Sequence, residues 1–255
     1  MKDIFNFRSR SAFYVYIFLN IFVFIVLFNR ILSFDFKNVL LCFTSIILFI
    51  TPNIIESMFN IRFPSFYKIC ILFFIFLSGV CGKIFNFYLT FPFLDTFLHT
   101  VNGFLCGALG VGILNYFFSN NIRISHYLII IFIILFANFI GVLWEVVEFS
   151  SDILLKTDAQ NDFVIRRFSS VELNKKKNGH AIIVDNIDHT DIYYINNGKM
   201  DKIVVDGYLD IGIIDTMRDL IVNLCGAIFF SILFILYMGN NKKYRFMNNF
   251  IILRN

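Results

Sequence analysis

Charged residues are scarce in this chain of 255 residues: 16% are Asp, Glu, Lys or Arg, whereas 58% are hydrophobic. A soluble domain is about one-quarter charged, so this chain has too little polar surface to cover a soluble core. Proline occurs three times and tryptophan once, and the composition excludes collagen-like, disordered and disulfide-rich secreted chains. What is abundant is phenylalanine, with 36 residues, and the mean hydropathy is +0.74. These values predict an integral membrane protein with several helical spans.

The sequence also lacks the motifs of several enzyme and cofactor classes. It has no serine-nucleophile motif, no HExxH, no P-loop and no dinucleotide fingerprint. Its five cysteines are an odd number without a CxxC pair and lie in or beside apolar runs, so we interpret them as packing residues. The net charge is +4, but the basic residues lie mostly at the ends of apolar runs, and no nucleic-acid partner is expected.

Six apolar runs are long enough to cross a bilayer, which takes about 20 helical residues. They are expected at residues 12–32, 37–55, 66–88, 93–117, 126–150 and 214–238. The long polar stretch 151–213 alternates apolar and polar residues and contains an Asn197-Gly198 turn signal, which predicts two to four short strands packed as a small β lobe. The predicted fold class is therefore an all-α polytopic membrane protein with six transmembrane helices and a small extracytoplasmic β-rich insertion between helices five and six. The corresponding divisions of the chain are 1–152, 153–213 and 214–255.

The distribution of Lys and Arg predicts the orientation in the membrane. With the N-terminus in the cytoplasm, ten basic residues flank the cytoplasmic ends of the spans: Lys2, Arg8, Arg10, Arg62, Lys68, Arg123, Lys242, Lys243, Arg245 and Arg254. The short outer loops carry only Arg30, Lys37 and Lys83. We therefore expect a multi-pass protein of the bacterial cytoplasmic membrane with both termini in the cytoplasm and the β-rich insertion outside.

Polar residues recur at helical spacing on the last three predicted spans. They are Asp95, His99 and Asn102 on the fourth, Asn138, Glu145, Glu148 and Asp152 on the fifth, and Asp215, Asp219 and Asn223 on the sixth, with Arg218 beside them. Each set occupies one face of its helix, and the predicted topology places all three sets in the outer half of the membrane. A charged side chain at the bilayer centre costs roughly 2.5–3.5 kcal/mol on insertion scales. We therefore expect these groups to face the protein interior and to offset one another's charge.

This grouping predicts a site with acid–base or metal chemistry. The candidate catalytic residues are His99, Glu145 and Asp219, as ligands or as a general base. The candidate ligands of a divalent cation are Asp95, His99, Glu145, Glu148 and Asp219, because carboxylate and imidazole groups suit Mg, Mn or Zn. We expect each of these five side chains to have a carboxylate or imidazole atom within roughly 5 Å of another member.

The same residues have structural interpretations, which the sequence leaves open. Asp95 and His99 would form a buried hydrogen bond between helices. Asp152 would be a solvated acid at the interface, or part of the mouth of the site together with Asp215. Asp215 would alternatively be the N-cap of the sixth span, with Asp219 stabilised by the helix dipole.

Two neighbours of the group are equally ambiguous. Arg218 is either a counter-ion to the acids or a side chain that extends to the headgroups. Trp144 is either an interfacial anchor or a wall of the site next to Glu145.

The motifs Asp95-x-x-x-His99, Trp144-Glu145-x-x-Glu148 and Asp215-Thr216-x-x-Asp219-Leu220-x-x-Asn223 resemble those of the YjdF-like family of bacterial membrane proteins. Gln160 is similar to a glutamine that follows the Trp-Glu-x-x-Glu segment in that family. The resemblance covers most of the chain from about residue 40 and implies a multi-spanning fold without an assigned activity. Residues 161–208 depart from it, because the family's usual connection there is short. A looser resemblance extends to VanZ-like membrane proteins, which share the Asp-x-x-x-His and Asp-x-x-x-Asn-x-x-Gly spacings and are associated with glycopeptide tolerance.

Three functional hypotheses follow. The first is a membrane enzyme, dependent on a metal ion or on protons, that acts on an envelope or lipid-linked substrate. The second is a non-enzymatic tolerance, immunity or assembly module whose β-rich insertion binds a partner. The third is an ion-coupled transporter in which the acids form a cation site or proton relay. The lipid bilayer is the partner common to all three.

Overall fold

The computed structural model describes residues 9–117 and 125–254. Within these residues, six helical segments are long and apolar enough to cross a membrane: Arg10–Leu32, Phe36–Phe59, Ser65–Ile84, Phe93–Phe117, His126–Leu155 and Ile213–Gly239. Each coincides with a predicted span to within a few residues, so the six-span prediction is confirmed. Lys2, Arg8 and Arg123, three of the basic residues behind the predicted orientation, lie outside the described residues.

The six segments are built from eight helices, seven of them α-helices and one a π-helix. They are α1 (Arg10–Leu32), α2 (Phe36–Leu48), α3 (Thr51–Phe59), α4 (Ser65–Ile75), the π-helix η1 (Phe76–Ile84), α6 (Phe93–Phe117), α7 (His126–Leu155) and α8 (Ile213–Gly239). The second span is divided because Pro52 occupies the first turn of α3, where its missing N–H group is tolerated. The Asp35 side chain caps the start of α2 by accepting a hydrogen bond from the Asn38 amide.

The third span ends earlier than residue 88, where the sequence placed its end. The π-helix stops at Ile84, and Asn86 then adopts a left-handed backbone with φ 58°. A short helix, α5 (Phe87–Thr90), turns the chain toward α6. Hydropathy did not mark this boundary, because the apolar residues continue through the turn.

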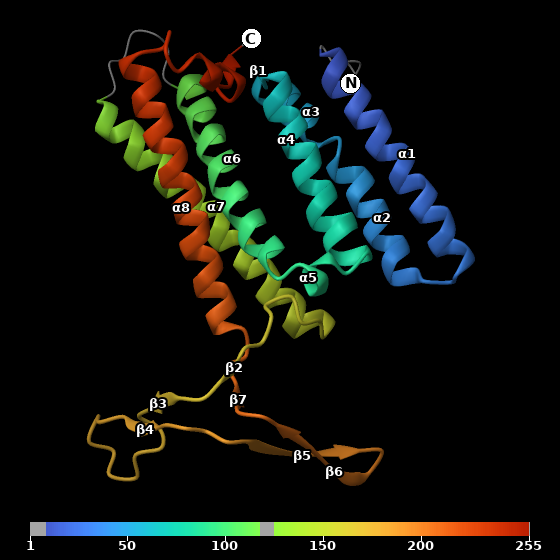
Figure 1. Ribbon diagram of the computed structural model, residues 1–255, viewed down its shortest axis with the longest axis vertical. Helices are drawn as coiled ribbons and strands as arrows, with labels where there is room; N and C mark the ends of the chain where they lie inside the picture. Colours follow the sequence, from blue (N-terminus) through green and yellow to red (C-terminus); the bar gives the residue numbers. More distant parts are fainter. Residues whose placement is uncertain (1–8, 118–124, 255) are drawn as a thin grey trace. The chain divides into compact units, whose positions relative to one another are not determined.

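The two larger apolar clusters among the described residues hold the membrane helices together. One joins α1, α2, α4 and η1 through residues such as Leu19, Cys42 and Leu72. The other joins α4, α6, α7 and α8 through residues such as Ala108 and Phe230. Since α4 contributes to both clusters, it links the two groups of helices, which Figure 1 shows on either side of it.

The chain divides into two compact units, Met1–Leu143 with Asp219–Asn255, and Trp144–Arg218. The first unit also contains the 3₁₀-helix η2 (Arg245–Asn249) and an antiparallel pair of short strands, β1 (Ile61–Arg62) and β8 (Leu253–Arg254). This pair joins the start of the third span to the end of the chain and was not predicted. The three-part division at residues 152 and 213 stays a prediction.

The second unit contains the β-rich insertion predicted between the last two spans. Its strands are β2 (Val164–Ile165), β3 (Phe168–Ser170), β4 (Ile182–Val184), β5 (Thr190–Asn196), β6 (Lys199–Val205) and β7 (Tyr208–Leu209). They form three antiparallel pairs, β2–β7, β3–β4 and β5–β6. The predicted Asn197-Gly198 turn closes the β5–β6 hairpin, with both residues at positive φ.

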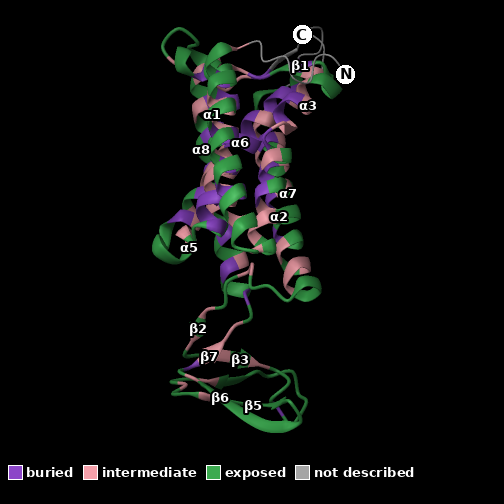
Figure 2. Cartoon of the chain, turned by 90° about the vertical axis from the view of Figure 1, so that its right-hand side faces the viewer, coloured by how far each residue is buried: buried purple, intermediate pink, exposed green. Residues whose placement is uncertain are grey.

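The strands of the insertion pair through their backbones but bury little side-chain surface. Every residue from Asp191 to Ile203 is exposed, and Figure 2 shows this hairpin in the colour of exposed residues. The expectation of two to four strands packed as a lobe is therefore corrected to six strands without an apolar core. The strands β2, β3 and β7 have only two or three residues. An alternation of apolar and polar residues cannot be recognised in the sequence over so short a length.

Candidate functional site

The site begins with two helices that approach each other unusually closely. A Cβ atom added at Gly103 on α6 would clash with the carbonyl oxygen of Asn223 on α8, and one added at Gly226 would clash with the carbonyl oxygen of Thr100. Only glycine at both positions allows the two backbones this contact. The close crossing sets His99 on α6 opposite Asp219 on α8.

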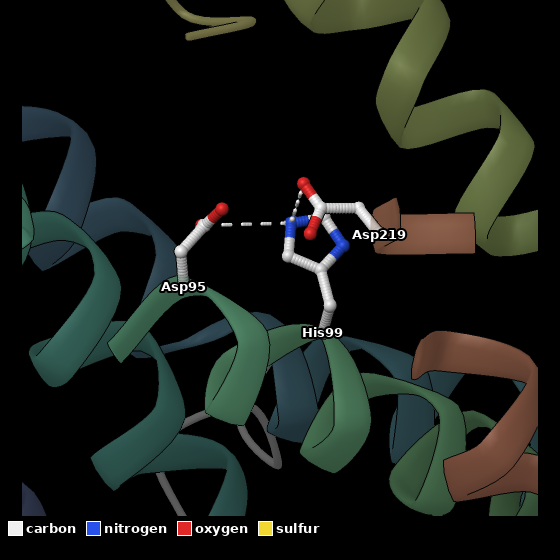
Figure 3. A group of neighbouring side chains, drawn as sticks. All are labelled: Asp95, His99 and Asp219. Carbon is white, nitrogen blue, oxygen red and sulfur yellow. Dashed lines mark ion pairs between the residues drawn. The ribbon is translucent and has the colours of Figure 1, made fainter. Parts of the chain in front are cut away.

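His99 lies between two carboxylates in the first unit (Figure 3). Its Nε2 atom is 3.7 Å from Asp95 Oδ1, one helical turn earlier, and 3.4 Å from Asp219 Oδ2 on the neighbouring helix. His99 is 7% exposed and Asp219 is 2% exposed. The three side chains thus form a largely buried group, which we call the Asp–His–Asp group.

The distances within the Asp–His–Asp group fit metal ligands better than direct hydrogen bonds. A charge-assisted N–H···O bond is about 2.7–2.9 Å long, shorter than either separation from Nε2. Two ligand atoms of one tetrahedral ion, each about 2.0–2.2 Å from it, lie roughly 3.3–3.6 Å apart. One ligand atom from each residue lies within 4.8 Å of the other two, so the three atoms can point to one ion between them.

Asn223, one turn beyond Asp219, has a structural environment. It is completely buried, and its Oδ1 accepts a hydrogen bond from Asn102 Nδ2 at 2.9 Å. Its Nδ2 donates to the Ala137 carbonyl at 3.2 Å and faces Gly141. One amide side chain therefore ties α8 to both α6 and α7 next to the Asp–His–Asp group, and fixes the distance between His99 and Asp219.

Glu145, Glu148 and Trp144 lie on the part of α7 that belongs to the second unit. Glu145 is buried, Glu148 is half-buried, and Trp144 is 45% exposed. The buried carboxyl group of Glu145 agrees with an inward-facing polar stripe on this helix. Its predicted grouping with His99 stays a prediction.

Asp152 and Asp215 hold the base of the insertion in the second unit. Asp152 accepts hydrogen bonds from the backbone amides of Ala159 and Gln160. Asp215 accepts two from Asn161, one from its backbone and one from its side chain. The predicted mouth residues thus have a structural task, which is to fold the 157–161 segment back onto the helix ends.

The alternative reading of Asp215 as the N-cap of the sixth span is wrong. Asp215 is the third residue of α8, and the carboxylate that accepts the Ile214 amide is that of Asp210. Arg218 is exposed and forms no ion pair with any residue in 9–117 or 125–254, which agrees with a side chain extending to the headgroups. Gln160, noted in the family resemblance, donates to Thr216 Oγ1 on the first turn of α8.

Sequence reasoning missed a second buried charged group, which we call the Lys68 group. Lys68 Nζ donates to Glu56 Oε2 at 2.6 Å and to Asn53 Oδ1 at 2.8 Å. The sequence placed Lys68 at a membrane flank, whereas it is 5% exposed. A single acid and a single base within neighbouring apolar segments were the signal that could have revealed it.

Comparison with known proteins gives one match. A family model described as "Predicted membrane protein (DUF2238)" matches residues 14–240, from the first span to one residue past α8. No curated protein and no solved structure matches this chain.

Proposed function

We infer the function from two premises: the chain belongs to the DUF2238 family of predicted membrane proteins, and its membrane helices hold the buried Asp–His–Asp group. We propose that this group binds a divalent cation and that the protein is a membrane-embedded enzyme. The proposed substrate is an envelope or lipid-linked molecule reached from the outer leaflet. Within the family, the motifs around His99, Glu145 and Asp219 support a YjdF-like member.

The observation that carries the proposal is the spacing of three ligand atoms in a buried place. A carboxylate as buried as Asp219 must be offset by a nearby positive charge or a bound cation. His99 offers one compensating group for two carboxylates, which leaves an excess of negative charge when all three are ionised. A divalent cation would offset that excess and would satisfy all three ligands together.

The proposed roles follow from ligand chemistry and from helical spacing. Asp95, His99 and Asp219 are the proposed ligands. Glu145 and Glu148, one turn apart on one face of α7, are proposed as a general base and a further ligand. When bound, such a cation supplies Lewis-acid polarisation and an activated water molecule.

The proposed setting is the bacterial cytoplasmic membrane, with both termini in the cytoplasm. The excess of Lys and Arg on the predicted inner flanks supports this orientation. With that orientation, α6 and α8 begin at the outer surface, and Asp95 and Asp219 lie in the first turn of α6 and the second turn of α8.

One observation favours a second candidate, a non-enzymatic module that binds a partner through the insertion. The β5–β6 hairpin exposes apolar side chains at its tip, including Ile195 and Met200. Surface apolar groups of this kind are common at binding sites. This candidate requires the hairpin and not the Asp–His–Asp group, whereas the enzyme requires the reverse.

Metal analysis of the full-length protein tests the proposal. We expect the detergent-purified protein, dialysed against Mn²⁺ or Zn²⁺, to retain about one ion per chain by elemental mass spectrometry. The His99→Ala variant should lose it, because an imidazole ligand is removed. The matched control is His126→Ala, which removes an exposed histidine at the start of α7 and should retain the ion. Equal metal content in all three proteins would refute the assignment.

A further inference from the structure

The Lys68 group lies at the opposite end of the membrane helices from the Asp–His–Asp group. Lys68 is in the first turn of α4, and Asp95 is in the first turn of α6, the next membrane-crossing helix along the chain. Consecutive spans start at opposite ends, as the course of the chain in Figure 1 shows. A function for this end is therefore independent of the metal site proposed above.

A pocket of about 230 Å³ opens beside Lys68. Its polar lining consists of Ser9, Glu56, Arg62, Ser65, Lys68 and Asn248. Pockets for drug-sized ligands are roughly 300–1,000 Å³, so this one suits a single headgroup or a small anion.

The charged groups of the lining leave an excess of positive charge. Both oxygens of Glu56 are engaged, one by Lys68 Nζ and the other by the Phe63 amide at 2.7 Å. Arg62 is exposed and has no ion-pair partner among the described residues. Two cations against one occupied carboxylate give the pocket a net charge of +1.

Hydrogen-bond donors without acceptors add to this positive lining. The α4 helix begins after Pro64 without a side-chain cap, and its first backbone bond is from the Lys68 amide to the Pro64 carbonyl. The amides that precede Lys68 in this turn therefore have no acceptor within the helix, and the same turn contributes Ser65 to the pocket lining.

A second, independent donor lies next to the pocket wall. Asn53 is 3% exposed, and its Nδ2 has no hydrogen-bond partner in the described part of the chain. Because Asn53 Oδ1 is 2.8 Å from Lys68 Nζ, covalent geometry places Nδ2 within about 5 Å of that ammonium group. A buried donor of this kind requires an acceptor, and residues 9–117 and 125–254 supply none.

We propose that this pocket binds the phosphate group of an anionic ligand, with Arg62 and Lys68 as cationic contacts and the start of α4 as a source of amide donors. Phosphate offers several acceptor oxygens and negative charge, which is what a lining of donors with net positive charge selects. The ligand is either a phospholipid headgroup or a soluble phosphate compound, since the pocket lies at a membrane-surface end of the helices.

Calorimetric titration of the full-length protein in a neutral detergent tests the proposal. The probes are inorganic phosphate, dihexanoyl phosphatidylglycerol and, as an uncharged lipid with the same chains, dihexanoyl glycerol. Arg62→Gln should weaken phosphate-dependent binding about tenfold, as expected for loss of a hydrogen bond to a charged group. Arg245→Gln, a change of another exposed arginine outside the pocket lining, should alter the affinity less than about twofold.

A second variant keeps the test independent of folding. Ser65→Asp places a carboxylate at the start of α4, which favours the helix but occupies the pocket, so it should abolish binding without lowering the melting temperature. Binding of phosphatidylglycerol alone would support a headgroup site, and binding of inorganic phosphate as well would support a soluble ligand. If neither phosphate probe binds, or if Arg62→Gln and Arg245→Gln behave alike, the proposal is overturned.

Discussion

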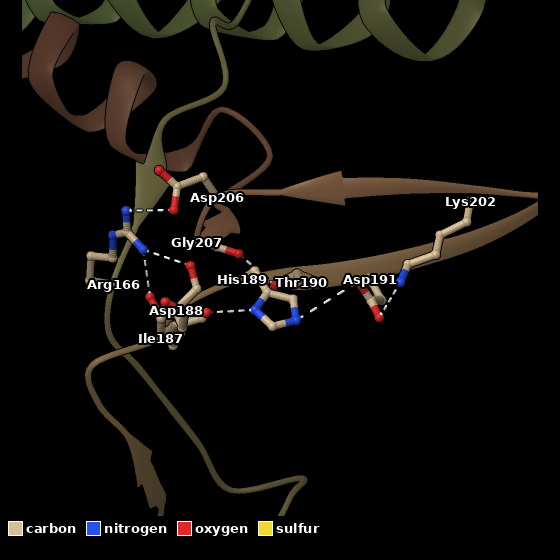
Figure 4. Close-up of polar contacts among 9 residues, drawn as sticks. All are labelled: Arg166, Ile187, Asp188, His189, Thr190, Asp191, Lys202, Asp206 and Gly207. Carbon is tan, nitrogen blue, oxygen red and sulfur yellow. Dashed lines mark hydrogen bonds and ion pairs between the residues drawn. The ribbon is translucent and has the colours of Figure 1, made fainter.

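At the scale of single residues, burial and neighbouring carboxylates determine what each histidine of this protein can do. His99 is buried between two carboxylates, whereas His189 in the insertion is exposed and pairs with its neighbour Asp188 (Figure 4). The first arrangement supports metal binding. The second is an exposed ion pair, and it shifts the pKa values of its two residues.

The pair in the insertion gives a prediction on pH. The hydrogen bond from His189 Nδ1 to Asp188 Oδ2, 2.7 Å long, and the charges of Asp188 and Asp191 raise the pKa of His189 above 6.5. A raised pKa contributes stability that is complete below the ordinary histidine pKa and is lost as the pH rises through the folded value. Histidine NMR titration should therefore show a pKa of His189 above 6.5, and Asp188→Asn should lower it.

The hydrogen bond to His189 also holds the pKa of Asp188 below its usual range, so the ionised pair persists between the two shifted values. A pKa of His189 that is unchanged by Asp188→Asn would contradict this assignment.

At the scale of helices, the site depends on the contact between α6 and α8. Gly103 and Gly226 bring the two backbones together, and Asn223 bonds across the same contact. Neither glycine takes part in chemistry. Both determine whether His99 and Asp219 are close enough to share a ligand.

Replacement of one glycine tests this dependence. Gly226→Ala should force the helices apart, because its Cβ would clash with the backbone oxygen of Thr100. We expect a loss of about 1–3 kcal/mol in unfolding free energy and weaker metal binding, measured by denaturant unfolding in detergent and by metal titration. Gly239→Ala on the same helix is the control, since nothing lies within 4 Å of an added Cβ there. Equal stabilities of the two variants would contradict the packing argument.

Much of the element structure could be predicted from the sequence. Hydropathy located all six spans, and Asn197-Gly198 located the main hairpin. The π-helix η1 and the β1–β8 pair could not be predicted, because hydropathy does not distinguish π from α and the pair joins residues far apart in the chain. Helical spacing indicated that Asp95, His99 and Asp219 face the same interior, and the structure brings these three side chains together. The spacing overlooked Lys68, since one lysine beside Pro64 looks like an ordinary flank.

At the scale of the whole molecule, the two units have separate internal supports. The membrane helices have apolar clusters, whereas the insertion rests on backbone pairing and on carboxylates at its base. Phe163 and Asp210 close that base, with the Asp210 amide donating to the Phe163 carbonyl at 3.1 Å. The strands beyond them form a removable part.

Removal of the strands distinguishes the two functional candidates. Residues 164–209 can be replaced by a two-glycine turn, because Phe163 and Asp210 already pair. The enzyme proposal predicts that the shortened protein keeps its melting temperature and metal content, while Asp219→Asn in the full chain loses the metal. The reverse pattern, with function lost only by the shortened protein, would favour the non-enzymatic module.

The most direct measurement is the position of an anomalous-scattering peak in crystals of the full-length protein grown with Mn²⁺ or Zn²⁺. We predict one peak between Asp95 Oδ1, His99 Nε2 and Asp219 Oδ2, about 2.0–2.2 Å from each ligand atom. The Asp219→Asn protein, crystallised in the same way, should lack it. A map with no peak there, and with His99 Nε2 bonded directly to a carboxylate at about 2.8 Å, would contradict the metal site and leave the group with a structural role.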